Sequence, residues 1–267
     1  MLNKLIIENM PYPDFVGLIN QWNVLPGAFT TLNKWINHSY IDSSSNILQI
    51  ACTTGFQVRE IAHLTKCSGK AFDLSRYAIE SAIKNKKIYS PSANIEYFVQ
   101  DGLNFKTNEK FTHVIVGGGL KFFSNPRKMV ENIISYFDDD GYLLASPFYA
   151  IKEVPSEVLD SCKQMFGIDV THEPYDEVMK LYKDFEILYE DRNQLRFESE
   201  EDISYYCDCI TRRAVKNLNC EDLYPVIYDR LYKIKEVTNE LRKYQEYSVL
   251  VLRYRKNIYP ERYVELF

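Results

Sequence analysis

A short apolar run that ends in small residues, Asn46–Gly55, is followed about twenty residues later by an apolar run that ends in one acid, Asp73. Between them, Gln57–Lys66 has the apolar spacing of an amphipathic helix. Strand, tight turn, helix, strand and acid form the layout of a nucleotide-binding βαβ unit. The small residues let the main chain approach a ligand, and the acid accepts hydrogen bonds from two ribose hydroxyls. The sequence therefore predicts a nucleotide site at the ends of these two strands.

The turn is not the dinucleotide fingerprint G-x-G-x-x-G, because Gly55 is its only glycine. The run Ile47–Gly55 resembles the first motif of class I S-adenosylmethionine (SAM) methyltransferases, which reads apolar-Leu-Asp-apolar-Gly-Cys-Gly-Thr-Gly. The positions that match are Cys52, Thr54 and Gly55, and those that depart from the pattern are Gln49, Ala51 and Thr53.

Three later segments follow in the order of that family. Asp73 begins an Asp-Leu-Ser-x-x-Ala-Ile run, Asp101-Gly102 closes the apolar run 95–100, and an Asp-Asp-Asp-Gly turn ends at Gly141. Together with the first motif they extend the resemblance over residues 46–149. Three glycines at Gly117–Gly119 end a continuous apolar run, which lets the main chain pass next to a ligand.

The resemblance implies SAM as cofactor and S-adenosylhomocysteine (SAH) as its product. In the family's pattern, Asp73 takes the ribose, Asp101 takes the adenine amino group, and the Ala51–Gly55 turn faces the methionine moiety. Leu74 is expected against the adenine ring, and Trp22 in a segment that folds over the cofactor. The residues expected to contact the cofactor are Trp22, Gln49, Ala51, Cys52, Thr53, Gly55, Asp73, Leu74, Asp101, Gly102 and Gly117. For the aromatic and leucine positions, ordinary core packing is the alternative.

Methyl transfer is an in-line displacement, so the enzyme has to align the acceptor with the methyl group and exclude water, and no metal is required. A base is needed only where the acceptor carries a proton that it must lose. The candidates near strand ends or in the cap are Tyr149, His172, Tyr182, Glu190 and Asp191. A structural or surface role is the alternative for each.

Strand and helix patterns alternate from residue 46 to residue 146, which predicts a parallel, doubly wound α/β sheet. The expected strands are Asn46–Ile50, Gly69–Leu74, Ile95–Gln100, Phe111–Val116, Tyr142–Ser146, Phe185–Asp191 and Ser248–Tyr254. The last two would form an antiparallel edge, making seven mostly parallel strands. We expect an N-terminal helical flap over 1–40, a Rossmann-like SAM-binding core over 41–150, and a helical cap with the last two strands over 151–267.

Composition limits the partners. The pI is near 5.5 and the net charge is −5, so the chain offers no attraction to phosphate backbones or anionic membranes. The six cysteines show no metal-ligand spacing, and there is no signal peptide or long apolar span. These features favour a cytoplasmic protein with reduced thiols, no metal and no nucleic-acid partner.

The family's amino-methylating nucleic-acid enzymes carry Asn/Asp-Pro-Pro-Tyr after strand four, where this chain has Gly117–Leu120. We therefore expect methylation of a small-molecule or peptide natural-product acceptor. Tyrosines on the cap helices and surplus acidic charge would suit an amine through cation–π and Coulomb attraction. These cap tyrosines are Tyr205, Tyr206, Tyr224, Tyr228 and Tyr232. O- or C-methylation, and SAM binding without catalysis, remain the alternatives.

Overall fold

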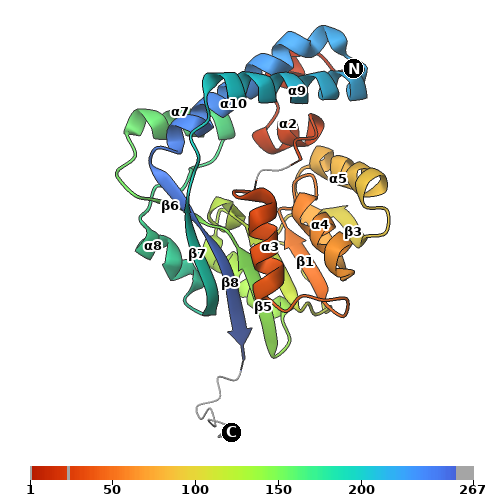
Figure 1. The fold of residues 1–267 in the computed structure, drawn as a ribbon, viewed down its shortest axis with the longest axis vertical. Coiled ribbons are helices and arrows are strands. Elements are labelled where there is room, and N and C mark those ends of the chain that lie inside the picture. The colour runs from red at the N-terminus through yellow and green to blue at the C-terminus, as the bar shows by residue number, and fades with distance from the viewer. Residues whose placement is uncertain (1, 23–24, 257–267) are drawn as a thin grey trace, which may run out of the picture.

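The computed structural model describes residues 2–22 and 25–256 of the 267-residue chain. An eight-stranded sheet lies at its centre, in the order β3-β2-β1-β4-β5-β8-β6, with β7 also paired to β8 (Figure 1). The strands are β1 (Asn46–Ile50), β2 (Ser68–Asp73), β3 (Asn94–Val99), β4 (His113–Gly117), β5 (Asp140–Ala145), β6 (Phe148–Ala150), β7 (Glu186–Gln194) and β8 (Gln245–Arg255). The first five pair in parallel, and β8 runs antiparallel to its neighbours. The predicted doubly wound sheet and its antiparallel edge are confirmed.

Helices cover both faces of the sheet, because its central strands are apolar on both sides. Ile47 and Leu48 in β1 are fully buried on opposite faces. One face packs against α3 (Ala28–His38), α4 (Phe56–Thr65) and α5 (Arg76–Tyr89). The other packs against α6 (Pro126–Tyr136) and α8 (Tyr175–Met179). A short 3-10 turn, Gly119–Phe122, follows β4.

A separate helical layer lies beyond the carboxyl ends of the parallel strands (Figure 1). It contains α7 (Ser156–Phe166), α9 (Glu200–Leu218) and α10 (Tyr224–Leu241), together with α1 (Lys4–Asn9) and α2 (Tyr12–Leu18). Ile7 and Phe15 from the N-terminal helices are fully buried in one apolar cluster with Ile227 and Leu231 of α10. The guanidinium of Arg230 bonds to the carbonyls at the end of α1, with Nη2 2.6 Å from Met10 O. We call these five helices the cap.

The N-terminal segment thus divides between two layers, with α1 and α2 in the cap and α3 on the sheet. Helix α2 also lies directly on α5. A β-carbon added at Gly17 would sit 2.3 Å from the main-chain nitrogen of Ala78, so only glycine permits this approach. Ser75 and Ser81 on α5 then donate hydrogen bonds to Asp14 and to the Gly17 carbonyl, at 2.5 and 2.8 Å. Residues 12–20 therefore connect cap and core.

Strand β6 extends the line of β5. Ala145 lies opposite Leu250 and Phe148 lies opposite Tyr247, so β8 pairs with both in one register. Ser146 and Pro147 separate the two, since proline has no N–H for the ladder. The fifth predicted strand therefore continues past the carboxyl ends of its neighbours.

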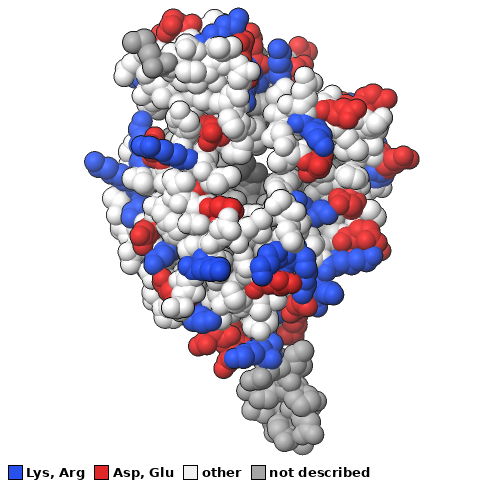
Figure 2. Space-filling view, turned by 180° about the vertical axis from the view of Figure 1, so that it is seen from behind, with Lys and Arg blue, Asp and Glu red and all other residues white. Residues whose placement is uncertain are grey.

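On the face that Figure 2 draws, described Lys and Arg residues are interspersed with Asp and Glu, and neither sign covers a continuous area. Among the described residues, no helix is both long and apolar enough to cross a membrane.

Candidate active site

The turn after β1 holds three alternate residues in the left-handed region. The φ angles are 53° at Ala51, 50° at Thr53 and 75° at Gly55. These are the three positions at which the methyltransferase motif has glycine. Alanine and the β-branched threonine are strained in this region, and such strain persists only where surrounding contacts enforce it. The turn therefore keeps its glycine-type path although two of the three glycines are replaced.

Main-chain bonds tie this turn to β2. The Cys52 N–H donates to the Phe72 carbonyl at 2.9 Å, and the Thr53 N–H donates to Asp73 Oδ2 at 2.9 Å. The other oxygen of Asp73, Oδ1, accepts from the Ser75 N–H at 2.9 Å. The acid at the end of β2 is therefore fixed against the turn at the end of β1.

Burial raises the pKa of Asp73 above its ordinary value, and the N–H bonds from Ser75 and Thr53 oppose that rise. The carboxyl is only 8% exposed, whereas the next side chain, Leu74, is 74% exposed. Ala51 is also exposed. A buried acid beside an exposed apolar side chain suits a ligand in which a sugar carries a flat aromatic base.

Gln49 is buried, and both the nitrogen and the oxygen of its side-chain amide bond to α4. Its Nε2 donates to Gln57 Oε1, and its Oε1 accepts from the Val58 N–H at 3.0 Å. The first N–H groups of a helix have no partner within the helix, so Gln49 satisfies one of them from the neighbouring strand. Gln49 therefore fixes the start of α4 relative to β1.

The ends of β3 and β4 complete the edge. Asp101 accepts from the Leu103 N–H at 3.0 Å and from Asn104 Nδ2 at 2.6 Å. Gly102 lies against Phe123, where a β-carbon would come within 2.9 Å of the ring. Gly117 ends β4 with φ 53°, and a β-carbon there would be 3.6 Å from Gln57 Nε2. Gly117 therefore lies within contact distance of the start of α4.

Trp22 reaches the turn through its main chain. Thr54 Oγ1 donates to the carbonyls of Gln21 and Trp22 at 2.9 and 3.2 Å. The Trp22 ring instead meets Tyr89 edge-on, with ring centroids 4.3 Å apart, and lies 5.5 Å from the guanidinium carbons of both Arg59 and Arg213. The ring is thus held by protein groups, while the carbonyls of residues 21 and 22 cover the turn.

Of the five candidates, Tyr149, Tyr182 and His172 form no hydrogen bond with one another among the described residues. Tyr149 lies on β6, past the end of β5, and its hydroxyl donates to Glu246 Oε2 at 3.2 Å. Burial, with Glu246 beside it, raises the pKa of Tyr149 to about 12. Tyr182 is buried in the apolar cluster under the α6 face, which raises its pKa further. His172 is exposed on the loop before α8, with Nδ1 3.1 Å from the Val170 carbonyl.

A family model described as a methyltransferase domain matches residues 41–201, which is more than half of the chain. This chain belongs to that methyltransferase-domain family. No curated protein sequence matches it.

Solved structures share the fold of this methyltransferase. MccD protein is 22% identical with a TM-score of 0.71, covering 87% of this chain and 100% of its own. A SAM-dependent methyltransferase from Thiobacillus denitrificans, in complex with SAH, is 13% identical with a TM-score of 0.67, covering 91% and 99%. Coclaurine N-methyltransferase, bound to N-methylheliamine and SAH, is 13% identical with a TM-score of 0.63, covering 92% and 80%. Two of these three structures hold SAH, the product that SAM leaves after methyl transfer.

The residues of the edge fit that cofactor. Nine buried side-chain polar atoms have no hydrogen-bond partner among the described residues, and two of them are Gln21 Oε1 and Ser146 Oγ. Gln21 belongs to the segment over the turn, and Ser146 is bonded through its N–H to the Gly117 carbonyl at 2.7 Å. Unpaired buried polar atoms are costly, and a polar ligand beside the turn and Gly117 would satisfy these two. Within the described residues, no group of His, Cys, Asp and Glu has the arrangement of a metal site.

Four carboxyl and phenol groups gather around β6, β7 and β8 of the methyltransferase. Tyr175 donates its hydroxyl to Glu190, 2.8 and 2.9 Å from the two carboxylate oxygens, and its ring meets that of Tyr149 edge-on at 5.3 Å. Ser248 also donates to Glu190, at 3.0 Å. The sequence pattern identified Tyr149 and Glu190 but not Tyr175 or Glu246, whose partners are separated from them by 15 and 97 residues.

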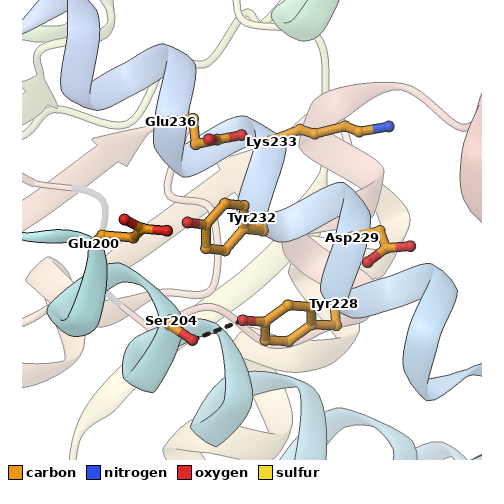
Figure 3. A pocket seen from close by; sticks show the side chains of 7 residues that line it. All are labelled: Glu200, Ser204, Tyr228, Asp229, Tyr232, Lys233 and Glu236. Atoms are coloured by element: carbon orange, nitrogen blue, oxygen red, sulfur yellow. Dashed lines mark hydrogen bonds between the residues drawn. The ribbon is translucent and has the colours of Figure 1, made fainter.

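The tyrosines of the cap helices have two different surroundings. Tyr206 is in the cap core, under the Lys235 ammonium 4.0 Å from its ring centroid. Tyr224, Tyr228 and Tyr232 stack along α10, with successive ring centroids 5.9 and 5.8 Å apart. Two of them line a groove of about 340 Å³ between α9 and α10, where Tyr228 bonds Ser204 at 2.9 Å (Figure 3). Only cap residues line this groove, so it is separate from the edge formed by β1, β2 and β4.

Proposed function

We propose that this methyltransferase binds SAM across the ends of β1, β2 and β4 and transfers its methyl group to a small-molecule or peptide acceptor. The hydrogen bond from the Thr53 N–H to Asp73 Oδ2 carries this proposal. It fixes the turn that would face the methionine moiety against the acid that would accept from the ribose. Ligands of open α/β sheets bind at such carboxyl ends.

The cofactor contacts follow from the positions along this edge. Asp73 accepts from the ribose hydroxyls, and Leu74 covers one face of the adenine. Asp101 accepts from the adenine amino group, and Gly102 lets the main chain beside it pass close to Phe123. The main chain at Ala51, Cys52, Thr53, Gly55 and Gly117 surrounds the methionine moiety. Gln49 contributes indirectly, because it fixes the start of α4 relative to β1. The main-chain carbonyl of Trp22 lies over the turn.

The acceptor is proposed to lie beside Tyr149, because β6 carries this residue past the ends of the parallel strands toward the cap. SAM supplies a methyl group on a sulfonium, so the chain has to hold the acceptor in line and exclude water. With a pKa of about 12, the Tyr149 hydroxyl stays protonated at neutral pH and its proton points to Glu246. Where the acceptor must lose a proton, Tyr149 Oη takes it as its own proton passes to Glu246.

An amine is the acceptor class that the surroundings support best. Tyr149 and Glu246 bring an aromatic ring and a carboxylate together, and an ammonium ion is attracted by both kinds of group. Glu190 and the Tyr175 ring, by contrast, already hold the guanidinium of Arg192. Coclaurine N-methyltransferase, which shares the fold, is crystallised with N-methylheliamine. A neutral hydroxyl or carbon acid is the alternative acceptor, and SAM binding without catalysis is the alternative function.

Isothermal titration with SAH, with NAD as the control ligand, tests the cofactor proposal. We expect micromolar binding of SAH, none of NAD, and loss of binding in Asp73→Ala. The acceptor proposal is tested by release of SAH from SAM in a panel of amines, alcohols and carbon acids. Turnover of neutral acceptors alone would overturn the amine assignment, and SAH binding without turnover of any acceptor class would favour a sensor.

Tyr149→Phe and Tyr182→Phe form a matched pair for the catalytic assignment. Both remove one hydroxyl from a buried ring, but only Tyr149 bonds a carboxylate. We expect Tyr149→Phe to lower kcat by about a hundredfold, as for loss of a general acid–base group, with unchanged SAH affinity. Equal activity in both variants would remove Tyr149 from the mechanism.

Free thiols at all six cysteines support a reducing compartment such as the cytoplasm.

A further inference from the structure

A hydrogen-bond path connects the cap to the turn after β1. Arg213 on α9 donates from Nη2 to the Asn20 carbonyl at 2.6 Å. The amides of Asn20 and Asn85 bond each other in both directions at 2.8 Å, and Asn85 Nδ2 also donates to the Thr54 carbonyl at 3.2 Å. Thr54 Oγ1 then donates back to residues 21 and 22. The path thus joins a cap residue to the residue between the two left-handed positions 53 and 55.

This path is buried almost throughout. Asn85 and Thr54 have no exposed surface, and Asn20 is 9% exposed. Removing one partner from a buried amide pair leaves the other unsatisfied, which makes each member costly to lose. Arg213 adds a second contact, because its guanidinium lies 5.5 Å from the Trp22 ring, whose carbonyl accepts from Thr54. Two routes from Arg213 therefore converge on Thr54.

The turn requires such support, because it holds Ala51 and Thr53 at positive φ without glycine. Strained conformations persist only where the surrounding structure enforces them. The bonds from Cys52 and Thr53 to β2 fix one side of the turn, and the path through Thr54 fixes the other. Arg213 lies outside the span 41–201 that matches the methyltransferase domain.

We propose that Arg213 is a positioning residue of the cofactor site, which holds the strained Ala51–Gly55 turn through Asn20, Asn85 and Thr54. The inference rests on the proposed place of the cofactor against this turn. Loss of Arg213 frees the turn to relax, so SAH must restore its conformation on binding and affinity falls. Where glycine removes the strain, the turn no longer depends on Arg213.

SAH titration of the full chain tests this with Arg213→Ala and Arg212→Ala. Arg212 is the matched control, because its side chain is 73% exposed and it pairs with Asp208 on the cap surface. We expect Arg213→Ala to raise the SAH dissociation constant about tenfold, a usual size for coupling between sites. Arg212→Ala should leave it unchanged.

A double-variant cycle separates positioning of the turn from general support of the fold. In the Ala51→Gly and Thr53→Gly background, Arg213→Ala should raise the dissociation constant less than about threefold, because little strain is left to hold. An effect as large as in the unaltered turn would overturn the proposal. A lower Tm with unchanged SAH affinity would overturn it as well.

Asn20→Gly gives a second break in the path that does not depend on Arg213→Ala folding well. Residue 20 has a φ of 53°, which glycine accepts without strain, and its carbonyl stays available to Arg213. We expect a similar loss of SAH affinity, and unchanged affinity would contradict the proposed path. Failure of the unaltered protein to bind SAH would instead refute the cofactor proposal itself.

Discussion

The Thr53 N–H lies 2.9 Å from Asp73 Oδ2, so the turn after the first strand is bonded to the acid that ends the second. Neither group is placed by its own strand alone. The carboxylate keeps the strained turn in position, and the turn N–H keeps the carboxylate oriented. A change at Asp73 therefore alters both the proposed ribose contact and the turn.

Asp73→Asn should weaken SAH binding by about ten- to a hundredfold, because hydrogen bonds to a charged group contribute about 1.5–3 kcal/mol. The amide keeps the size of the side chain but loses the charge and one acceptor. Titration calorimetry measures the change, and Asp169→Asn is the control, since Asp169 pairs with Lys163 on the exposed surface. Equal losses in the two variants would mean that the effect is not specific to the site.

The SAH affinity of the unaltered protein should fall on acidification at a higher pH than for an ordinary aspartate. Burial raises the pKa of Asp73, so the carboxylate takes up a proton earlier as the pH falls and loses acceptor capacity for the ribose. Titrations from neutral to mildly acidic pH should show the fall, and Asp73→Asn should flatten it. For folding the sign is opposite: a raised carboxyl pKa contributes stability that grows as the pH falls through it.

Ala51→Gly should stabilise the protein by about 1 kcal/mol, in contrast to the usual cost of glycine. The φ of 53° costs alanine about 1–2 kcal/mol, which exceeds the added entropy of a glycine in the unfolded chain. Urea unfolding measures the difference. Gly55→Ala is the reverse control and should destabilise, because its φ is 75° and a β-carbon would lie 2.8 Å from the Tyr97 ring. A destabilised Ala51→Gly would contradict the strain at this position.

Gly17→Ala should destabilise the protein by about 3 kcal/mol, despite the better helix propensity of alanine. The new methyl group would meet main-chain atoms of Tyr77 and Ala78 at 2.3–2.7 Å, which cannot rotate away. Gly119→Ala is the matched control, because its β-carbon would meet nothing within 4 Å. A normal Tm in Gly17→Ala would show that α2 does not need its close approach to α5.

One cysteine should react quickly with a thiol reagent. Cys209 is exposed, whereas Cys52, Cys67, Cys162, Cys207 and Cys220 are buried. Burial raises the pKa of each of the buried five and so suppresses the reactive thiolate. We expect one rapid equivalent in the native protein, lost in Cys209→Ser. Fast labelling of a second thiol would contradict the burial of the cap or the turn.

The parts of this fold that follow from the sequence are those with local patterns. The run Phe111–Val116 is apolar without a break, as in a strand buried on both faces, and β4 lies there. His113, within this run, is only 2% exposed, and its Nε2 lies 2.8 Å from the Ser39 carbonyl. By contrast, β6 was not predicted, because Pro147 ends the local pattern and only pairing with β8 restores it.

The site is less visible in the sequence, because its groups interact over long distances in the chain. The acid at position 73 stands out after an apolar run, but its bond to Thr53 depends on strand packing. Asn20, Asn85 and Arg213 carry no motif, and the bond from Arg213 spans 193 residues. The local sequence pattern makes Tyr149 and Tyr182 equal candidates for a catalytic base. The pairing of β6 with β8 places Tyr149, and not Tyr182, opposite Glu246. Long-range pairing therefore decides what local spacing leaves open.

The position of β8 has a consequence for how the chain reaches this fold during translation. Three strands, β5, β6 and β7, find their hydrogen-bond partner in residues 245–255. Until that segment leaves the ribosome, β5 remains an open strand edge, a state from which chains associate with one another. Synthesis of the hundred residues between β5 and β8 takes about 5–20 s at 5–20 residues per second. Until then, β5 carries unpaired main-chain N–H and C=O groups along one side.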